Sequence, residues 1–338
     1  MKKLLATLLK IAVSAAIIGY LVYDATQGKG NANVFANLVN QPKHWGILVL
    51  AWWSCAVAVL LTFIRWWYLV RALDIPCPFF DAIRIGFWGY LFNLAPLGIV
   101  GGDLVKAVML DHEHPNNRAK ALASVLVDRV IGLYVLFVVA SAAILLTGLW
   151  RIDVAEIKNI CWATFAITVG GGFGLAFVMG PEAWVGRAIR TVGRIPRAGP
   201  PLESLIRAVR MFNRRPRVLV LASLMTVGVH GFFAVGCYLI ACGLPGNHLS
   251  FAQHFVVMPL SAAMQVIPVP IGPTEFALDY FYANVPAAAG PPIAKGQGLV
   301  VSLVYRLITV LIAALGVFYY FGNRRELVEV IHEAEQDK

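Results

Sequence analysis

The sequence predicts an all-α polytopic membrane protein. We expect about six full transmembrane helices and two broken re-entrant hairpins, eight or more membrane segments in all, arranged as an inverted repeat. Of the 338 residues, 59% are hydrophobic and 14% charged, whereas a soluble domain is nearer half apolar and a quarter charged. Several apolar runs approach or exceed the ~20 residues that span a bilayer. These two observations disfavour a soluble enzyme with a large core.

The net charge of +10 is concentrated in one stretch, over residues 181–217. That stretch holds nine arginines: Arg187, Arg190, Arg194, Arg197, Arg207, Arg210, Arg214, Arg215 and Arg217. Such a cluster of arginines is typical of a cytoplasmic loop under the positive-inside rule. The same arginines can also contact anionic lipid head groups. No aromatic-and-basic module accompanies the arginines, so we expect no nucleic-acid partner.

Apolar runs predict the full transmembrane helices. We expect these helices over about 4–23, 45–70, 119–149, 160–180, 218–242 and 297–321. The polar stretch 24–43, with its glycines and a proline, reads as a loop. Arg65 and Arg71 indicate that the second helix ends on the cytoplasmic side.

Within the Arg-rich stretch, five apolar residues recur at helical spacing. They are Leu202, Leu205, Ile206, Val209 and Phe212. Because arginines lie off that stripe, the pattern predicts a helix on the membrane surface.

Two further apolar segments, 79–110 and 251–284, are broken in the middle by matching motifs. The first reads NLAPLGIVGGD over 93–103, and the second reads QVIPVPIGPTE over 265–275. Six residues mark the expected hairpin breaks: Pro96, Gly101, Gly102, Pro268, Pro270 and Gly272. Paired interruptions at corresponding places in two halves point to the binding site of a transporter.

Aligned without a gap, the two motifs match Asn93 with Gln265 and Asp103 with Glu275. The side-chain amides of Asn93 and Gln265 can form hydrogen bonds either to a substrate or to backbone groups that lose their helical partners at the break. Basic residues near both ends of the first segment, among them Lys106, indicate a hairpin that enters and returns on the cytoplasmic side. We interpret Lys106 as an interfacial anchor, with a ligand role as the alternative. Irregular backbone at membrane depth is tolerated where it lines a cavity.

The match extends over two repeats, 45–149 and 218–322, joined by the connector 181–217. SVLVDRVIGL at 124–133 aligns with VSLVYRLITV at 301–310, which puts Arg129 on Arg306. With a cytoplasmic N-terminus, the transmembrane helices between the hairpins bring the second hairpin in from the opposite side. The repeats are therefore expected to be inverted, which is the arrangement expected for alternating access.

Charged side chains in the apolar segments allow two interpretations, because a charge inside a bilayer is costly and has to pair or line a polar path. In the structural one, Asp128 or Asp103 pairs with Arg129, and Glu275 pairs with Arg306. In the other, both arginines attract an anionic phosphate in a cavity. The carboxylates then bind a proton or a cationic head group.

At these residues the chain resembles the lysylphosphatidylglycerol synthase transmembrane region family. The resemblance rests on NLAPLGIVGGDLVKAVML, ASVLVDRVIGL and QVIPVPIGPTE, and covers roughly residues 5–322. It implies a flippase-like bundle with two re-entrant hairpins that moves a lipid between leaflets. The second motif departs from the family's usual glycine-rich form at Pro273 and Thr274.

Function is accordingly expected to be that of a lipid flippase or transporter acting on a phosphate-bearing lipid. The alternative is a non-transporting membrane partner of a lipid-modifying or glycosyl-transferring enzyme. We expect no enzyme activity, because the chain carries no aminoacyl-transferring domain and no acidic pair in a long extramembrane loop. No metal or other cofactor is expected, and DHEHPNN at 111–117 reads as a solvated loop. The expected location is a bacterial-type cytoplasmic (inner) membrane, with both termini cytoplasmic.

Overall fold

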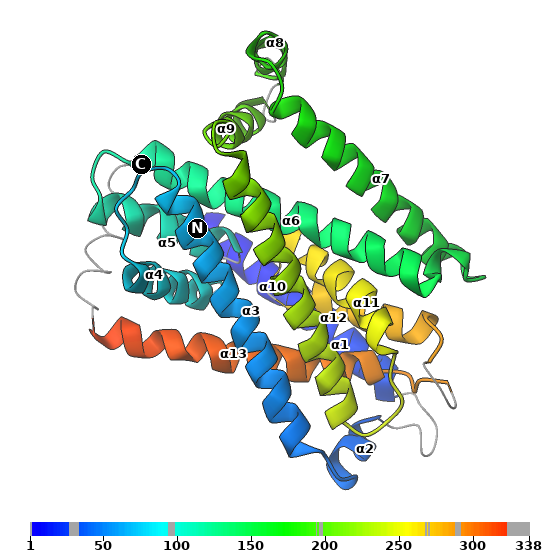
Figure 1. Cartoon of the computed structure of the whole chain (residues 1–338). Coiled ribbons are helices and arrows are strands. Elements are labelled where there is room, and N and C mark those ends of the chain that lie inside the picture. Colours follow the sequence, from blue (N-terminus) through cyan, green and yellow to red (C-terminus); the bar gives the residue numbers. More distant parts are fainter. Residues whose placement is uncertain are drawn as a thin grey trace.

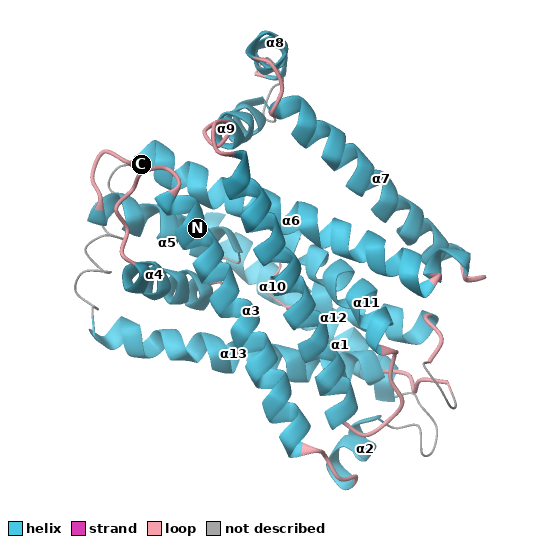
Figure 2. Ribbon diagram, viewed as in Figure 1, coloured by secondary structure: helices cyan, strands magenta, loops and turns pink. Residues whose placement is uncertain are grey.

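The computed structural model describes residues 2–26, 34–93, 99–193, 195, 199–267, 269, 271–287 and 292–322. Over these ranges the chain is entirely helical (Figures 1 and 2). The elements are α1 (Lys2–Thr26), α2 (Val34–Asn40), α3 (Trp45–Arg71), α4 (Phe79–Phe92), α5 (Ile99–Glu113), α6 (Arg118–Thr147), the 3-10 helix η2 (Leu149–Arg151), α7 (Ala155–Val178), α8 (Glu182–Val192), α9 (Gly199–Arg210), α10 (Pro216–Gly243), α11 (Phe251–Ala263), the 3-10 helix η3 (Met264–Val266), α12 (Pro273–Asn284) and α13 (Gln297–Gly322). The predicted all-α class is confirmed.

Six helices are long and apolar enough to cross a bilayer: α1, α3, α6, α7, α10 and α13. They correspond to the six predicted transmembrane runs, so the protein is a multi-pass membrane protein. The stretch 24–43, predicted as a loop, contains the short helix α2. Its apolar residues Val34, Phe35 and Leu38 pack on the core, and this burial orders a segment whose polar composition indicated a loop.

The two predicted broken segments are pairs of short helices, α4 with α5 and α11 with α12. None exceeds 15 residues, which is about 22 Å of helix against a hydrocarbon core of about 30 Å. Pro96, Pro268 and Pro270, three of the expected break residues, lie outside the described residues. Gly101 and Gly102 lie inside the beginning of α5, so they do not interrupt the helix.

Helices α3 and α10 lie side by side at the centre and run in opposite directions (Figure 1). Small residues bring them together. A Cβ added to Gly236 would lie 2.6 Å from Cys55 Sγ, and one added to Gly243 would lie 2.7 Å from Leu48. The Ser54 hydroxyl donates to the Phe232 carbonyl at 2.7 Å. Close approach through small residues is the usual basis of helix packing in membranes.

The packing of the two repeats follows one scheme. In each, the first long helix contacts the first short helix, the short helices contact each other, and the second short helix contacts the last long helix. The first short helix of each repeat also packs on the last long helix of the other, α4 on α13 and α11 on α6. Helices α6 and α13 run in opposite directions (Figure 1). An inverted relation between 45–149 and 218–322 would produce these contacts; the relation itself stays a prediction.

The connector forms α8 and α9 at one end of the molecule (Figure 1). The predicted surface helix corresponds to α9, while α8 is an additional helix. Arg210 joins the two, because its guanidinium donates to the carbonyls of Val178 and Gly180 and pairs with Glu182. Arg215 pairs with Asp74 at 2.7 Å, just after α3. The connector is therefore attached to the bundle by arginines that also count toward its positive charge.

Candidate functional site

The first charged site joins α5 to α6 through Asp103 and Arg129. Arg129 Nε donates to Asp103 Oδ2 at 2.5 Å, and its Nη2 donates to Oδ1 at 2.6 Å. This is the bidentate geometry in which a guanidinium holds a carboxylate most firmly. The Asp103 side chain is 17% exposed and that of Arg129 is 42% exposed. The arginine side chain is therefore partly exposed, while the carboxylate is held against the protein.

The second charged site joins α12 to α13 through Glu275 and Arg306. Arg306 Nε and Nη2 both donate to Glu275 Oε1, at 2.9 and 2.8 Å. The other oxygen, Oε2, accepts the backbone N–H of Gly272 at 2.7 Å. Gly272 has φ +123°, a conformation that favours glycine, and it precedes the first turn of α12. Glu275 is 2% exposed and Arg306 is 27% exposed.

The two sites occupy matching places in the repeats. Each joins the second short helix of a pair to the following long helix, and each consists of the aligned carboxylate and arginine. Asp128, the other candidate partner for Arg129, pairs with Arg65 instead, at 2.7 Å. The structural interpretation of these charges therefore has a physical basis at both sites, with Asp103 as the partner of Arg129.

Arg65 does not mark the membrane surface, contrary to the expectation from its place near the end of an apolar run. Its side chain is buried in α3, where Nε pairs with Asp128 and Nη1 donates to Thr226 Oγ1 at 2.9 Å. Arg71, two turns nearer the end of the helix, is exposed as expected. One feature of the sequence did indicate that Arg65 is buried. It lies six residues before the last residue of α3, inside the apolar run and not at its end.

Lys106 is also buried, so its expected role as an interfacial anchor is wrong. It is 7% exposed, and its Nζ lies over the rings of Trp66 and Phe63, at 5.3 and 5.8 Å from their centroids. The aliphatic part of the side chain runs across Gly89, where an added Cβ would lie 2.9 Å from both Cγ and Cε. This close approach is why the lysine can enter the space between α4, α5 and α3.

Comparison with known proteins decides the family. The family model described as lysylphosphatidylglycerol synthase TM region matches residues 7–316. The chain belongs to the lysylphosphatidylglycerol synthase TM region family. The match covers both charged sites, the connector, the whole of α3, α6, α7 and α10, and most of α1 and α13. A comparison with curated proteins gives no match.

The two motifs of this chain align Asn93 with Gln265, but the structure gives the two residues different surroundings. Asn93 directly follows α4 as its C-cap, and its Oδ1 is buried without a hydrogen-bond partner in the described part of the chain. An added Cβ on Gly102 would lie 2.3 Å from that oxygen. Gln265 lies in η3 and is exposed. The structure brings Asn93, but not Gln265, into the packed part of its hairpin.

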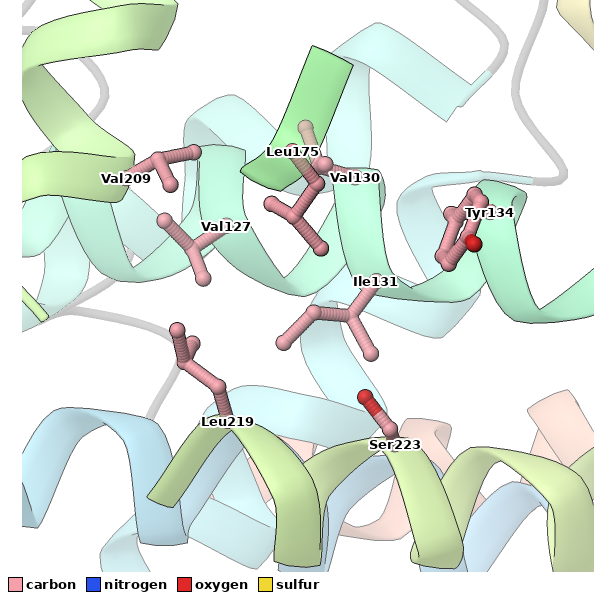
Figure 3. Close-up of a pocket in the computed structure, with 8 residues that line it drawn as sticks. All are labelled: Val127, Val130, Ile131, Tyr134, Leu175, Val209, Leu219 and Ser223. Atoms are coloured by element: carbon pink, nitrogen blue, oxygen red, sulfur yellow. The ribbon is translucent and has the colours of Figure 1, made fainter. Parts of the chain in front are cut away.

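An apolar pocket lies between α6, α7, α9 and α10 of the protein (Figure 3). Its lining is Val127, Val130, Ile131, Tyr134, Leu175, Val209, Leu219 and Ser223. Arg129 lies two residues from both Val127 and Ile131, which is about 200° around the helix. The pocket and the guanidinium therefore face different sides of α6, and the pocket offers no charged group for a head group.

The histidine-containing stretch 111–117 is only partly the loop that was expected. Helix α5 continues to Glu113, which pairs with Arg84 of α4 at 2.5 Å. Over the described ranges, no three His, Cys, Asp or Glu side chains come together as a metal site would require.

Proposed function

We propose that this protein is a flippase-like lipid transporter that moves a phosphate-bearing lipid between leaflets by alternating access. One observation carries the proposal: carboxylate–arginine pairs occur at matching places in the two repeats, Asp103 with Arg129 and Glu275 with Arg306. Ionisable groups inside a membrane are costly, and they are characteristic of substrate pathways.

The geometry of both pairs supports a role in binding as well as in structure. Each arginine uses Nε and Nη2 for its carboxylate. The Nη1 group of each has no hydrogen-bond partner within the described ranges and remains for an oxygen of a phosphate, which arginine binds well. Both arginine side chains are partly exposed, whereas the side chains of their acidic partners are more buried. In this proposal Asp103 and Glu275 act as gates or proton sites.

The short helices support the transport mechanism. As re-entrant hairpins from opposite leaflets, α4–α5 and α11–α12 would bring the two charged sites to a common chamber, and rocking of the repeats would open it to either side. In this arrangement the connector and both termini face the cytoplasm, and the protein lies in a bacterial-type inner membrane. Asn93 and Gln265 would contact the lipid or the backbone near the breaks. The mechanism involves no covalent chemistry and no cofactor.

Lipid movement in proteoliposomes tests the proposal. The purified protein is reconstituted with fluorescently labelled phosphatidylglycerol, phosphatidylethanolamine or a polyprenyl phosphate, and dithionite quenching reports the fraction of label in each leaflet. We expect movement of at least one lipid class by the wild type and loss in Asp103→Asn and Arg129→Ala. Lys158→Leu changes an exposed position of α7 and serves as control. Wild-type inactivity with every class would contradict transport.

A second candidate is a non-transporting membrane partner of a lipid-modifying or glycosyl-transferring enzyme. The observation that favours it is the exposure of the connector arginines, among them Arg187, Arg190 and Arg214. They form no ion pair with the described residues and are available to an acidic surface. Co-purification of such an enzyme, together with inactivity in the lipid assay and loss of the enzyme on changing these arginines to glutamine, would favour this candidate.

A further inference from the structure

Lys106 is a buried lysine with no carboxylate partner among the described residues. The residue is 7% exposed, and no ion pair or hydrogen bond of its Nζ exists within the described ranges. The two aromatic rings beneath it, Trp66 and Phe63, attract the charge with their faces. An ammonium group has three donors, and faces of rings replace only part of its hydration.

The carboxylates around Lys106 are already neutralised by arginines. Asp103 is held by Arg129 in two hydrogen bonds, and Asp128 is held by Arg65. The cluster thus has three cations and two anions, and Lys106 interacts electrostatically with all four of the other groups. With every side chain in its ordinary ionised form, the formal charge of the cluster is +1. A buried lysine in such surroundings either gives up its proton or is stabilised as a cation by an anion that joins it.

The second repeat lacks this surplus. The gapless alignment that matches Asp103 with Glu275 puts Leu278 at the position of Lys106, and Leu278 is a buried core residue. The alignment that matches Arg129 with Arg306 puts Tyr305 at the position of Asp128. The pair formed by Glu275 and Arg306 is therefore neutral by itself. The two matching sites differ by one unit of charge, and the difference resides at Lys106.

We propose that Lys106 binds the anionic phosphate of the transported lipid, and that the first repeat alone provides this phosphate site. The inference rests on the proposed function and assigns its head-group contact to one residue. An anionic oxygen bound by Nζ of Lys106 and Nη1 of Arg129 would offset the formal charge of the cluster without breaking either ion pair. The second repeat, with Leu278 in place of the lysine, would release the head group more readily. This asymmetry fits a transporter that loads on one side and unloads on the other.

Binding measurements on the purified full-length protein test the site. The probes are dihexanoyl phosphatidylglycerol, inorganic phosphate and the uncharged dihexanoyl glycerol, each titrated by calorimetry. The variants are Lys106→Leu, which copies the second repeat, and the polar Lys106→Gln. Lys158→Leu removes the same charge from an exposed position of α7 and is the matched control. Monodispersity and thermal unfolding establish that each variant is folded.

We expect both Lys106 variants to bind phosphatidylglycerol at least tenfold more weakly, with the control unchanged. Loss for phosphatidylglycerol alone would show that the site takes a lipid head group, and parallel loss for inorganic phosphate would show that phosphate itself is recognised; either supports the proposal. Unchanged affinity, or equal binding of the uncharged dihexanoyl glycerol, overturns it. If neither variant folds, a photoactivatable phosphatidylglycerol decides on the wild type. Cross-links to residues 63–66 and 103–106 support the site, and cross-links elsewhere overturn it.

Lipid movement, measured on the same preparations, separates this inference from the function on which it rests. A wild type that moves lipid while the Lys106 variants bind normally contradicts only the phosphate site. A wild type that moves no lipid but binds phosphatidylglycerol through Lys106 contradicts transport and leaves the site in place.

Discussion

Arg65 and Asp128 form a buried ion pair between α3 and α6, with Nε 2.7 Å from Oδ1. Thr226 of α10 accepts a second hydrogen bond from the same guanidinium, so three long helices meet at one arginine. The second repeat has Tyr305 at the position of Asp128 and does not reproduce this pair. The interaction belongs to the first repeat and lies beside the proposed phosphate site.

Changing Asp128 to asparagine should destabilise the protein by about 3 to 5 kcal/mol, because it leaves a buried guanidinium without its counter-charge. Thermal unfolding in detergent measures the loss. The double variant Arg65→Leu/Asp128→Leu should lose less than the sum of the single changes, since it removes both charges together. Additive losses would contradict a direct pair.

Gly102→Ala should separate α4 from α5. The added Cβ would lie 2.0 Å from the carbonyl oxygen of Gly89 and 2.3 Å from Oδ1 of Asn93, and backbone cannot move aside as a flexible side chain can. We expect a loss of about 1 to 3 kcal/mol, as for other overpacked cores. Gly170→Ala is the control, because nothing lies within 4 Å of the added methyl. Equal stability of the two variants would show that this close approach is not required.

Glu275→Gln should cost more stability than Asp103→Asn. Glu275 is buried, pairs with Arg306 and accepts the N–H that begins α12, so we expect a loss of about 3 kcal/mol. Asp103 faces a half-exposed arginine, and loss of its charge should cost about 1 kcal/mol. Thermal unfolding of both variants under the same conditions compares them. The reverse order would contradict this difference in burial.

Arg210→Ala should loosen the connector, because Arg210 bonds to the end of α7 and to Glu182 of α8. We expect hydrogen–deuterium exchange in α8 to become at least several times faster, with the long helices unchanged. Arg214→Ala removes an exposed arginine of the same connector and should have no effect. Equal exchange in both variants would show that Arg210 does not hold α8.

Single cysteines on the two hairpins should be labelled from opposite sides of the membrane if the repeats are inverted. Asn116→Cys follows the first hairpin and Pro286→Cys follows the second; both positions are exposed. An impermeant maleimide on sealed vesicles reports the side. Labelling of both from one side would contradict an inverted repeat.

In the maleimide experiment, the native cysteine Cys77, which lies in a loop, should contribute little background labelling. Burial raises the pKa of Cys77 to about 12, and the thiolate is the reactive form. At pH 7.5 the Cys77 thiol is protonated and should remain unlabelled. Reactivity of Cys77 would rise only as the pH approaches 12, and labelling located at Cys77 by peptide mapping at pH 7.5 would contradict its burial.

The sequence by itself determined the class of this protein, its six long helices and the two places where a pair of short helices replaces a long one. Those features depend on composition and on runs of neighbouring residues, and both can be read directly from the sequence. It also aligned Asp103 with Glu275 and Arg129 with Arg306, which the structure finds as two ion pairs.

Only the tertiary structure decided which charged side chains are partners and which buried side chain has no carboxylate partner among the described residues. Arg65 and Asp128 are 63 residues apart, and Lys106 Nζ lies over rings from another helix. Near the ends of apolar runs, a buried cation and an interfacial one look alike in sequence, because the difference depends on the helix packed against them. The physical reason is that pairing and desolvation are properties of neighbours in space, and helices distant along the chain provide those neighbours.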